Sequence, residues 1–123
     1  MTEGALVAGL AAEGTVAPSD PVPVSTWSNG PGDRYAAHRH DYDKVLLATR
    51  GSIVFELAEA TQEVELQAGD RLDLPAGTLH GAHVGRHGVS CAEAHLPAGV
   101  LGESPRRRTG WLSGRQTAGR PTS

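Results

Sequence analysis

Histidines at short spacing are the residues of this sequence that could bind a metal ion. His38 and His40 are separated by one residue, and on a β-strand this spacing places both side chains on one face, about 6–7 Å apart. His80 follows a turn containing Pro75 and Gly77 on a different predicted strand. Three neutral imidazoles from two strands could hold one divalent metal and leave positions open for water, dioxygen or substrate. The alternative is that these histidines are polar residues on a half-exposed sheet face.

Short apolar segments separated by glycine- and proline-containing turns must position these histidines. Gly51 is expected to lie where two strands reverse, because a positive φ is favoured there. Short strands at this spacing favour a sandwich or a closed barrel. The predicted strands are Val24–Ser28, Lys44–Ala48, Ser52–Leu57, Glu63–Gln67, Arg71–Leu74, His80–Val84 and Val89–His95.

The length of 123 residues suits one domain. Residues 1–23 are expected to form a short helix over Glu3–Ala12 followed by a linker, and residues 24–101 the barrel. Residues 102–123 lack periodicity and are expected to form a flexible, arginine-rich tail, although Trp111 and Leu112 could dock back onto the barrel. We therefore expect removal of the residues after 104 to leave the fold intact.

The charge distribution argues against nucleic acid as a partner. Residues 1–105 carry six basic and fourteen acidic side chains, a net charge of −8, whereas residues 106–123 carry five arginines and no acid. A domain with this negative charge is electrostatically unsuited to nucleic acid. The apolar stretch Ala5–Ala12 is too short to span a membrane, so no membrane association is expected. Cys91 is the only cysteine, which excludes an intrachain disulfide and fits a cytoplasmic location.

Two groups of residues resemble the two sequence motifs of the cupin superfamily. The first consists of Gly32, His38, His40, Lys44 and Gly51, and the second of Gly69, Pro75, Gly77 and His80. The resemblance implies a small, all-β, single-domain barrel (a double-stranded β-helix or jelly roll) with a short N-terminal helix added here. It also implies Fe, Mn, Ni, Cu or Zn bound inside the barrel by three histidines, here His38, His40 and His80, and by one glutamate.

The segment from Trp27 to Tyr35, followed by Asp43-Lys-Val-Leu, is similar to a group of small bacterial cupins of unassigned function. Cupins of this size often pair, so a homodimer is a further expectation of the resemblance. A homodimer would protect the exposed edges of the barrel.

Lys44 stands where the cupin motif has its glutamate. It shares strand parity with His38 and His40, so its ammonium is expected to point toward the same interior, where it would repel a metal ion. It could bend away to pair with a carboxylate, be held neutral and act as a base or ligand, or bind an anionic ligand where metal is weak or absent. Tyr42 has the same parity and could line the pocket as a hydrogen-bond donor or simply pack in the core. Lys44 and Tyr42 are the candidate catalytic residues.

Glu93 is the candidate partner of Lys44. On the last predicted strand, Cys91, Glu93 and His95 share one face, and alanines occupy the other. If the face of Glu93 is interior, its carboxylate could pair with Lys44 or supply the missing ligand; if it is exterior, Glu93 is a solvated surface acid. His83 is expected on the surface, and Cys91 is expected to be a buried thiol rather than a reactive one.

Together these features favour a metal-dependent enzyme of the dioxygenase or isomerase type acting on a small polar or anionic molecule. In such an enzyme Lys44 could anchor a substrate carboxylate or stabilise an enolate. The alternative is a non-catalytic module that binds or senses a small molecule, with or without metal.

Overall fold

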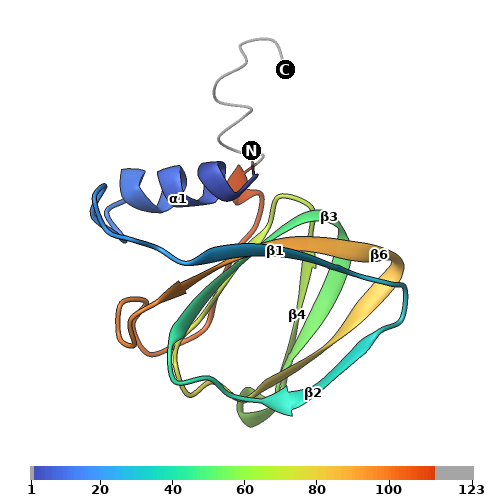
Figure 1. Cartoon of the computed structure of the whole chain (residues 1–123). Coiled ribbons are helices and arrows are strands. Elements are labelled where there is room, and N and C mark those ends of the chain that lie inside the picture. The colour runs from blue at the N-terminus through green and yellow to red at the C-terminus, as the bar shows by residue number, and fades with distance from the viewer. Residues whose placement is uncertain (1, 113–123) are drawn as a thin grey trace.

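A seven-stranded antiparallel sheet curls around an apolar interior, and one helix lies against its outer face (Figure 1). The computed structural model describes residues 2–112. The strands neighbour one another in the order β1-β6-β3-β5-β7, with β2 also paired to β6 and β4 to β3. The elements are α1 (Thr2–Ala12), β1 (Val24–Asn29), β2 (Arg34–His38), β3 (Asp43–Leu57), η1 (Ala58–Ala60), β4 (Gln62–Gln67), β5 (Arg71–Leu74), β6 (His80–Leu96) and β7 (Arg106–Arg108). The expectation of an all-β barrel with a short N-terminal helix is confirmed.

The long strands β3 and β6 pair along most of their length and shape the barrel. Each was expected as two short strands, but each continues through its glycine break. Gly51, expected where strands reverse, instead lies within β3, with a φ of 70°. A Cβ atom there would overlap the carbonyl oxygen of Gly88 in β6. Glycine at position 51 therefore allows β3 to bend while it stays paired with β6, so neither strand ends there.

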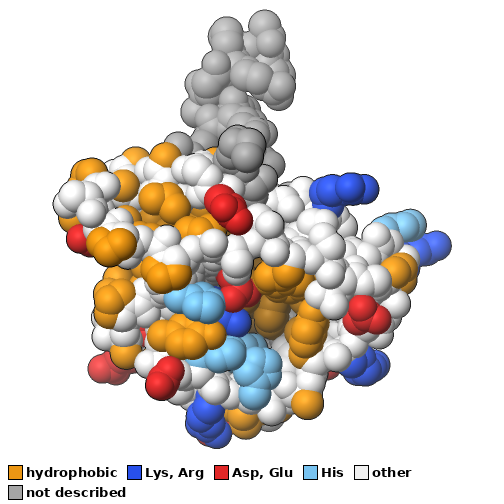
Figure 2. Space-filling view, viewed as in Figure 1, with side chains coloured by type: hydrophobic (Ala, Val, Ile, Leu, Met, Phe, Trp, Pro, Cys, Tyr) orange, Lys and Arg blue, Asp and Glu red, His pale blue; other side chains and the backbone are white. Residues whose placement is uncertain are grey.

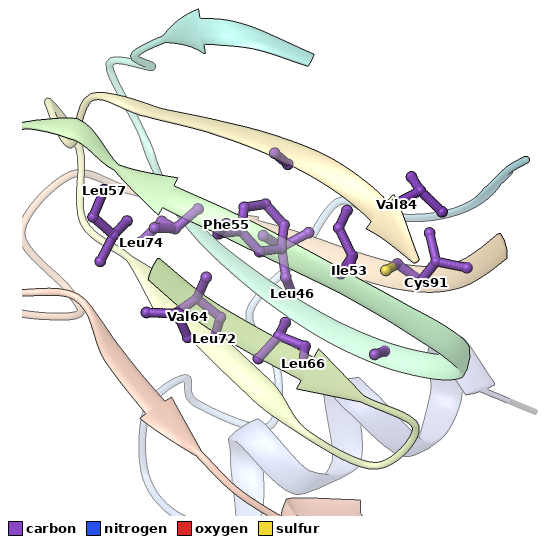
Figure 3. Packing of buried hydrophobic residues seen from close by; sticks show 13 residues of the cluster. Leu46, Ile53, Phe55, Leu57, Val64, Leu66, Leu72, Leu74, Val84 and Cys91 are labelled. Carbon is purple, nitrogen blue, oxygen red and sulfur yellow. The ribbon is translucent and has the colours of Figure 1, made fainter. Parts of the chain in front are cut away.

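The inner face of the sheet forms the main hydrophobic core (Figure 3). Alternate residues of β3, beginning with Leu46 and continuing with Ile53, Phe55 and Leu57 after the bend, point into it. Cys91 of β6 belongs to the same cluster, so its face of β6 is the interior one. This places Glu93, two residues further along, on the interior face as well.

The outer face of β3 and β6 is covered by α1, as the upper part of Figure 1 shows. Leu6 and Leu10 of the helix are fully buried and belong to a second apolar cluster with Val45 and Leu47 of β3. Because β3 is buried on both faces here, its sequence is continuously apolar and does not alternate. Within residues 2–112, no helix has the length and apolar character needed to cross a membrane.

The segment expected to be a flexible tail is partly folded, which corrects the prediction for residues 106–112. Arg106–Arg108 form β7, antiparallel to β5. The backbone N–H of Gly110 donates to Asp70 (2.7 Å), and Trp111 packs against the cluster under α1, so the docking expected of Trp111 is confirmed. Residues 113–123 of the expected tail lie outside the described residues.

A buried arginine explains why this segment is held in place. Arg71 in β5 has no exposed side-chain surface and binds Asp73 through two hydrogen bonds of 2.7 and 3.1 Å. It also donates to Glu13, which accepts a hydrogen bond from Arg108 as well. The guanidinium lies 5.0 Å from the ring centre of Trp111. The end of α1, β5 and the C-terminal segment therefore share one charged cluster, which local sequence patterns do not reveal.

Removal of the residues after Pro105 should lower the melting temperature by about 10 °C or more, contrary to the expectation from sequence. The truncation removes β7, the Arg108 hydrogen bond to Glu13 and the packing of Trp111. Truncation after Leu112 retains these contacts and is the matched control. Thermal unfolding followed by circular dichroism would test this, and equal melting temperatures for the two truncated forms would contradict it.

Candidate metal centre

His38, His40 and His80 come together at one end of the barrel. His38 is the last residue of β2 and pairs in register with His80, the first residue of β6. His40 lies in the segment that follows β2. One ring nitrogen of each histidine lies within 4.8 Å of the others. The three residues differ in exposure, because His38 is exposed, His40 is half-buried and His80 is buried. In Figure 2, histidine side chains gather beside a hollow on this face.

The backbone orients two of the three imidazoles. His38 Nδ1 lies 2.8 Å from the carbonyl oxygen of Ala36, and His80 Nδ1 lies 2.9 Å from that of Thr78. Since a carbonyl oxygen can only accept, each Nδ1 carries the proton and donates it. In a neutral ring this leaves the lone pair on Nε2, the arrangement typical of metal-binding histidines.

The spacing of the ring nitrogens fits one metal ion. The Nε2 atoms of His38 and His40 are 3.1 Å apart. Metal–nitrogen bonds of 2.0–2.1 Å in a tetrahedral arrangement separate two ligand nitrogens by about 3.3 Å. The donor set therefore suits a divalent transition metal. Nε2 of His40 has one lone pair, which can face either Lys44 or a metal ion placed beside His38, but not both.

Lys44 is the feature that opposes metal binding. Its Nζ lies 3.2 Å from Nε2 of His40 and 3.8 Å from a carboxylate oxygen of Glu93. Burial lowers the pKa of Lys44, partly offset by Glu93. Burial, together with the charge of Lys44, also lowers the pKa of His40 to about 4, which favours the neutral imidazole at neutral pH. The lysine thus contacts both a histidine and a carboxylate.

Glu93 lies inside the barrel and pairs with Lys44, so the alternative of a solvated surface acid is wrong. Its carboxylate accepts hydrogen bonds from Nε1 of Trp27 (2.8 Å) and is 2.6 Å from Nε2 of His95. Burial alone would raise the pKa of Glu93, but the hydrogen bond from His95, the charge of Lys44 and the bond from Trp27 outweigh burial and lower it. Glu93 is therefore an anion that three neighbours stabilise.

Tyr42 lies beside the histidines but not among the residues that line the interior cavity. Its ring stacks between those of His40 and His95, with centroid distances of 4.8 and 4.2 Å. Neither the expected pocket position nor ordinary core packing describes this arrangement. Burial raises the pKa of Tyr42, so the ring is an uncharged support for His40.

A cavity of about 270 Å³ opens beside the histidines within the barrel. Sequence reasoning did not predict that Trp27 and Tyr35 line it; their only signal was the resemblance of the Trp27–Tyr35 segment to other small cupins. The cavity is lined by Trp27, Asn29, Tyr35, His38, Lys44, Leu46, Ile53, Phe55, His80, Gly81, Ala82 and Glu93.

Three further residues, His83, Cys91 and Asp43, lie outside this chemistry. His83 is 3.1 Å from Glu56 in a half-exposed pair, as expected for a surface residue. Cys91 is buried, and burial raises the pKa of its thiol to about 12, so it is a poor nucleophile. Asp43, which is fully buried, accepts backbone hydrogen bonds from Ala76 and Leu101 and so serves the fold.

Solved structures with a similar fold include enzymes and a protein known only by its superfamily. An oxalate decarboxylase variant from Bacillus subtilis aligns with a TM-score of 0.56 and 17% identity, over 65% of this chain and 22% of that one. A cupin superfamily protein from Desulfitobacterium hafniense DCB-2 aligns with a TM-score of 0.55 and 24% identity, over 67% of this chain and 72% of that one. The oxalate decarboxylase of Lactobacillus farciminis aligns with a TM-score of 0.54 and 18% identity.

This chain spans about a fifth of the length of the oxalate decarboxylase chains that it matches. The Bacillus subtilis enzyme contains Mn(II) centres. No protein-family model matches the sequence, and no curated protein matches it. At these identities the likeness concerns the fold of the barrel.

Proposed function

We propose that this protein, whose barrel has the cupin fold, binds one divalent transition metal ion through His38, His40 and His80 and holds a small molecule beside it. The observation that carries this proposal is the orientation of the imidazoles. The backbone carbonyls of Ala36 and Thr78 take the Nδ1 protons of two rings, which leaves Nε2 lone pairs near a common point. Fe, Mn, Ni, Cu and Zn all accept such ligands.

The chemistry proposed for this site is that of a dioxygenase or an isomerase acting on a small polar or anionic molecule. A metal with three imidazole ligands has open positions, at which it could activate dioxygen or polarise a carbonyl group. Lys44 lines the adjacent cavity and would place a positive charge beside a substrate carboxylate or a developing enolate. We assign Tyr42 a supporting role, because its ring stacks on His40.

Metal analysis of untagged protein tests the proposal. After incubation with each of the five metals and removal of excess, at least one should remain at about one equivalent per chain. Less than about a tenth of an equivalent of every metal, in protein with an unchanged circular dichroism spectrum, would contradict metal binding. It would favour the second candidate function, a metal-free binding module.

The second candidate rests on the contact between Lys44 and His40. In this contact the ammonium takes the lone pair that a metal would use. A metal-free cupin could hold an anionic molecule on Lys44 without using His40 as a ligand. Binding of small anions by the metal-free protein would support this function.

The variant Lys44→Met should bind zinc at least about tenfold more tightly than the natural protein. Methionine keeps most of the side-chain volume but removes the charge beside the metal position and frees Nε2 of His40. Calorimetric titration with Zn²⁺ measures the effect, and Arg50→Met, at an exposed position of β3, is the control for general loss of positive charge. Weaker zinc binding by Lys44→Met would instead show that the lysine helps to hold the metal.

A further inference from the structure

Part of the lining of the interior cavity is apolar. Trp27 and Tyr35 form an edge-to-face pair with ring centres 6.1 Å apart. Leu46, Ile53 and Phe55 of β3, all buried in the core, line the cavity with them. Trp27 directs its only polar atom, Nε1, to Glu93, so its ring faces are available for apolar contact. An oxyanion without an apolar body would leave these apolar side chains in contact with water only.

The rest of the lining is polar, and its charges would be uneven once a metal is bound. His38, His80, Lys44 and Glu93 line it. The charges of Lys44 and Glu93 offset each other, and Glu93 is already engaged by Trp27 and His95. Histidines bind metal in their neutral form, so these ligands would not neutralise the positive charge of a divalent ion. An anionic group of the ligand would be attracted to the metal ion.

The size of the cavity limits what can fill it. A volume of about 270 Å³ lies just below the usual range of pockets for drug-sized molecules. It can accommodate a single ring or a branched chain with one acidic group.

We infer that the ligand of this site is a small monocarboxylate with an aromatic or branched apolar body. The carboxylate lies between the metal position and Lys44, and the body contacts Trp27, Tyr35 and Phe55. This inference rests on the metal site proposed above and adds the class of ligand.

A series of four probes separates the two parts of the inference. The protein, with and without one equivalent of Zn²⁺, is titrated calorimetrically with phenylacetate, acetate, oxalate and 2-phenylethanol. Phenylacetate should bind the zinc form at least about tenfold more tightly than acetate or oxalate, because only it buries an apolar body. It should also bind more tightly than 2-phenylethanol, and its affinity should fall at least about tenfold without zinc.

The variant Ala82→Leu tests where the apolar body lies. Ala82 is buried and lines the cavity, so a larger side chain should reduce phenylacetate affinity about tenfold while zinc affinity and acetate binding change little. Ala98→Leu, at an exposed position after β6, is the matched control and should leave all three unchanged. If Ala82→Leu does not fold, the four probes on the natural protein still decide the outcome.

The possible failures are distinct. Absence of zinc binding by the natural protein would overturn the proposed function, and this inference with it. Zinc binding together with equal or tighter binding of acetate or oxalate would overturn only the apolar body. Phenylacetate affinity that is unaffected by zinc would overturn only the pairing of the carboxylate with the metal.

Discussion

Replacing His38 by alanine should lower zinc affinity about 100-fold or more. Loss of a single hydrogen-bond partner behind a metal ligand already costs 10–100-fold in affinity, and loss of the ligand itself should cost at least as much. His38 is the most suitable of the three for this test, because its side chain is exposed at the end of β2. Its removal therefore creates no buried cavity and should leave the fold intact.

The matched control is His83→Ala, which should leave zinc affinity within about twofold of the natural value. His83 belongs to the same sheet and pairs with Glu56, but it does not line the cavity. Both variants are titrated with Zn²⁺ by calorimetry, and their circular dichroism spectra are compared. Unchanged zinc affinity in folded His38→Ala would contradict the three-histidine site. An equal loss in both variants would point to nonspecific binding on surface histidines.

Replacing Arg71 by alanine should reduce the free energy of unfolding by about 3–5 kcal/mol, the usual cost of breaking a buried ion pair. Arg71 and Asp73 have side chains that are 0% and 4% exposed, so removal of the guanidinium leaves a buried carboxylate without its two hydrogen bonds. It also removes the contact with Glu13 and the cation beneath Trp111. Urea denaturation measures the loss.

Arg107→Ala is the control for the loss of Arg71. Arg107 lies one position away in the pairing of β5 with β7, but it is exposed and donates to the backbone oxygen of Glu65. Its removal should change stability by no more than about 0.5 kcal/mol. The double variant Arg71→Met, Asp73→Leu should recover much of the stability lost in Arg71→Ala, because it leaves no buried charge. A loss below about 1 kcal/mol in Arg71→Ala would contradict the importance of the cluster.

Part of this structure follows directly from local sequence. Alternation and turn residues predicted the helix over Glu3–Ala12 and most of the strand residues, because each depends on residues a few positions apart, but β2 and β7 were not among the predicted strands. Proximity of His38 and His40 was expected from their spacing on one strand, but His40 lies in the segment after β2, and the local path of the chain there brings the two rings together. Placement of His80 beside them rested on the resemblance to the cupin motifs, since no local rule relates positions 38 and 80.

Other features depended on contacts between distant segments, and there the sequence was ambiguous or misleading. Glycine at position 51 indicated the end of a strand, but the approach of Gly88 makes it a bend within β3. Arginines in residues 106–108 suggested a solvated tail, but the acidic groups of Asp73 and Glu13, which bind Arg71 and Arg108, lie far away in the sequence. Whether a run of charged residues is ordered depends on partner residues elsewhere in the chain, which the composition of the run does not reveal.

The sequence by itself determined that this chain has the short strands and turns of a small β-barrel, because strand alternation and turn chemistry are local properties, and the resemblance to the cupin motifs indicated the three histidines. Only the tertiary structure decided that Glu93 faces the interior and that Lys44 lies between it and His40. It also decided that Tyr42 supports the site from outside the cavity. The physical reason is that alternation defines two faces of a strand, whereas closure of the barrel and the covering helix decide which face is buried.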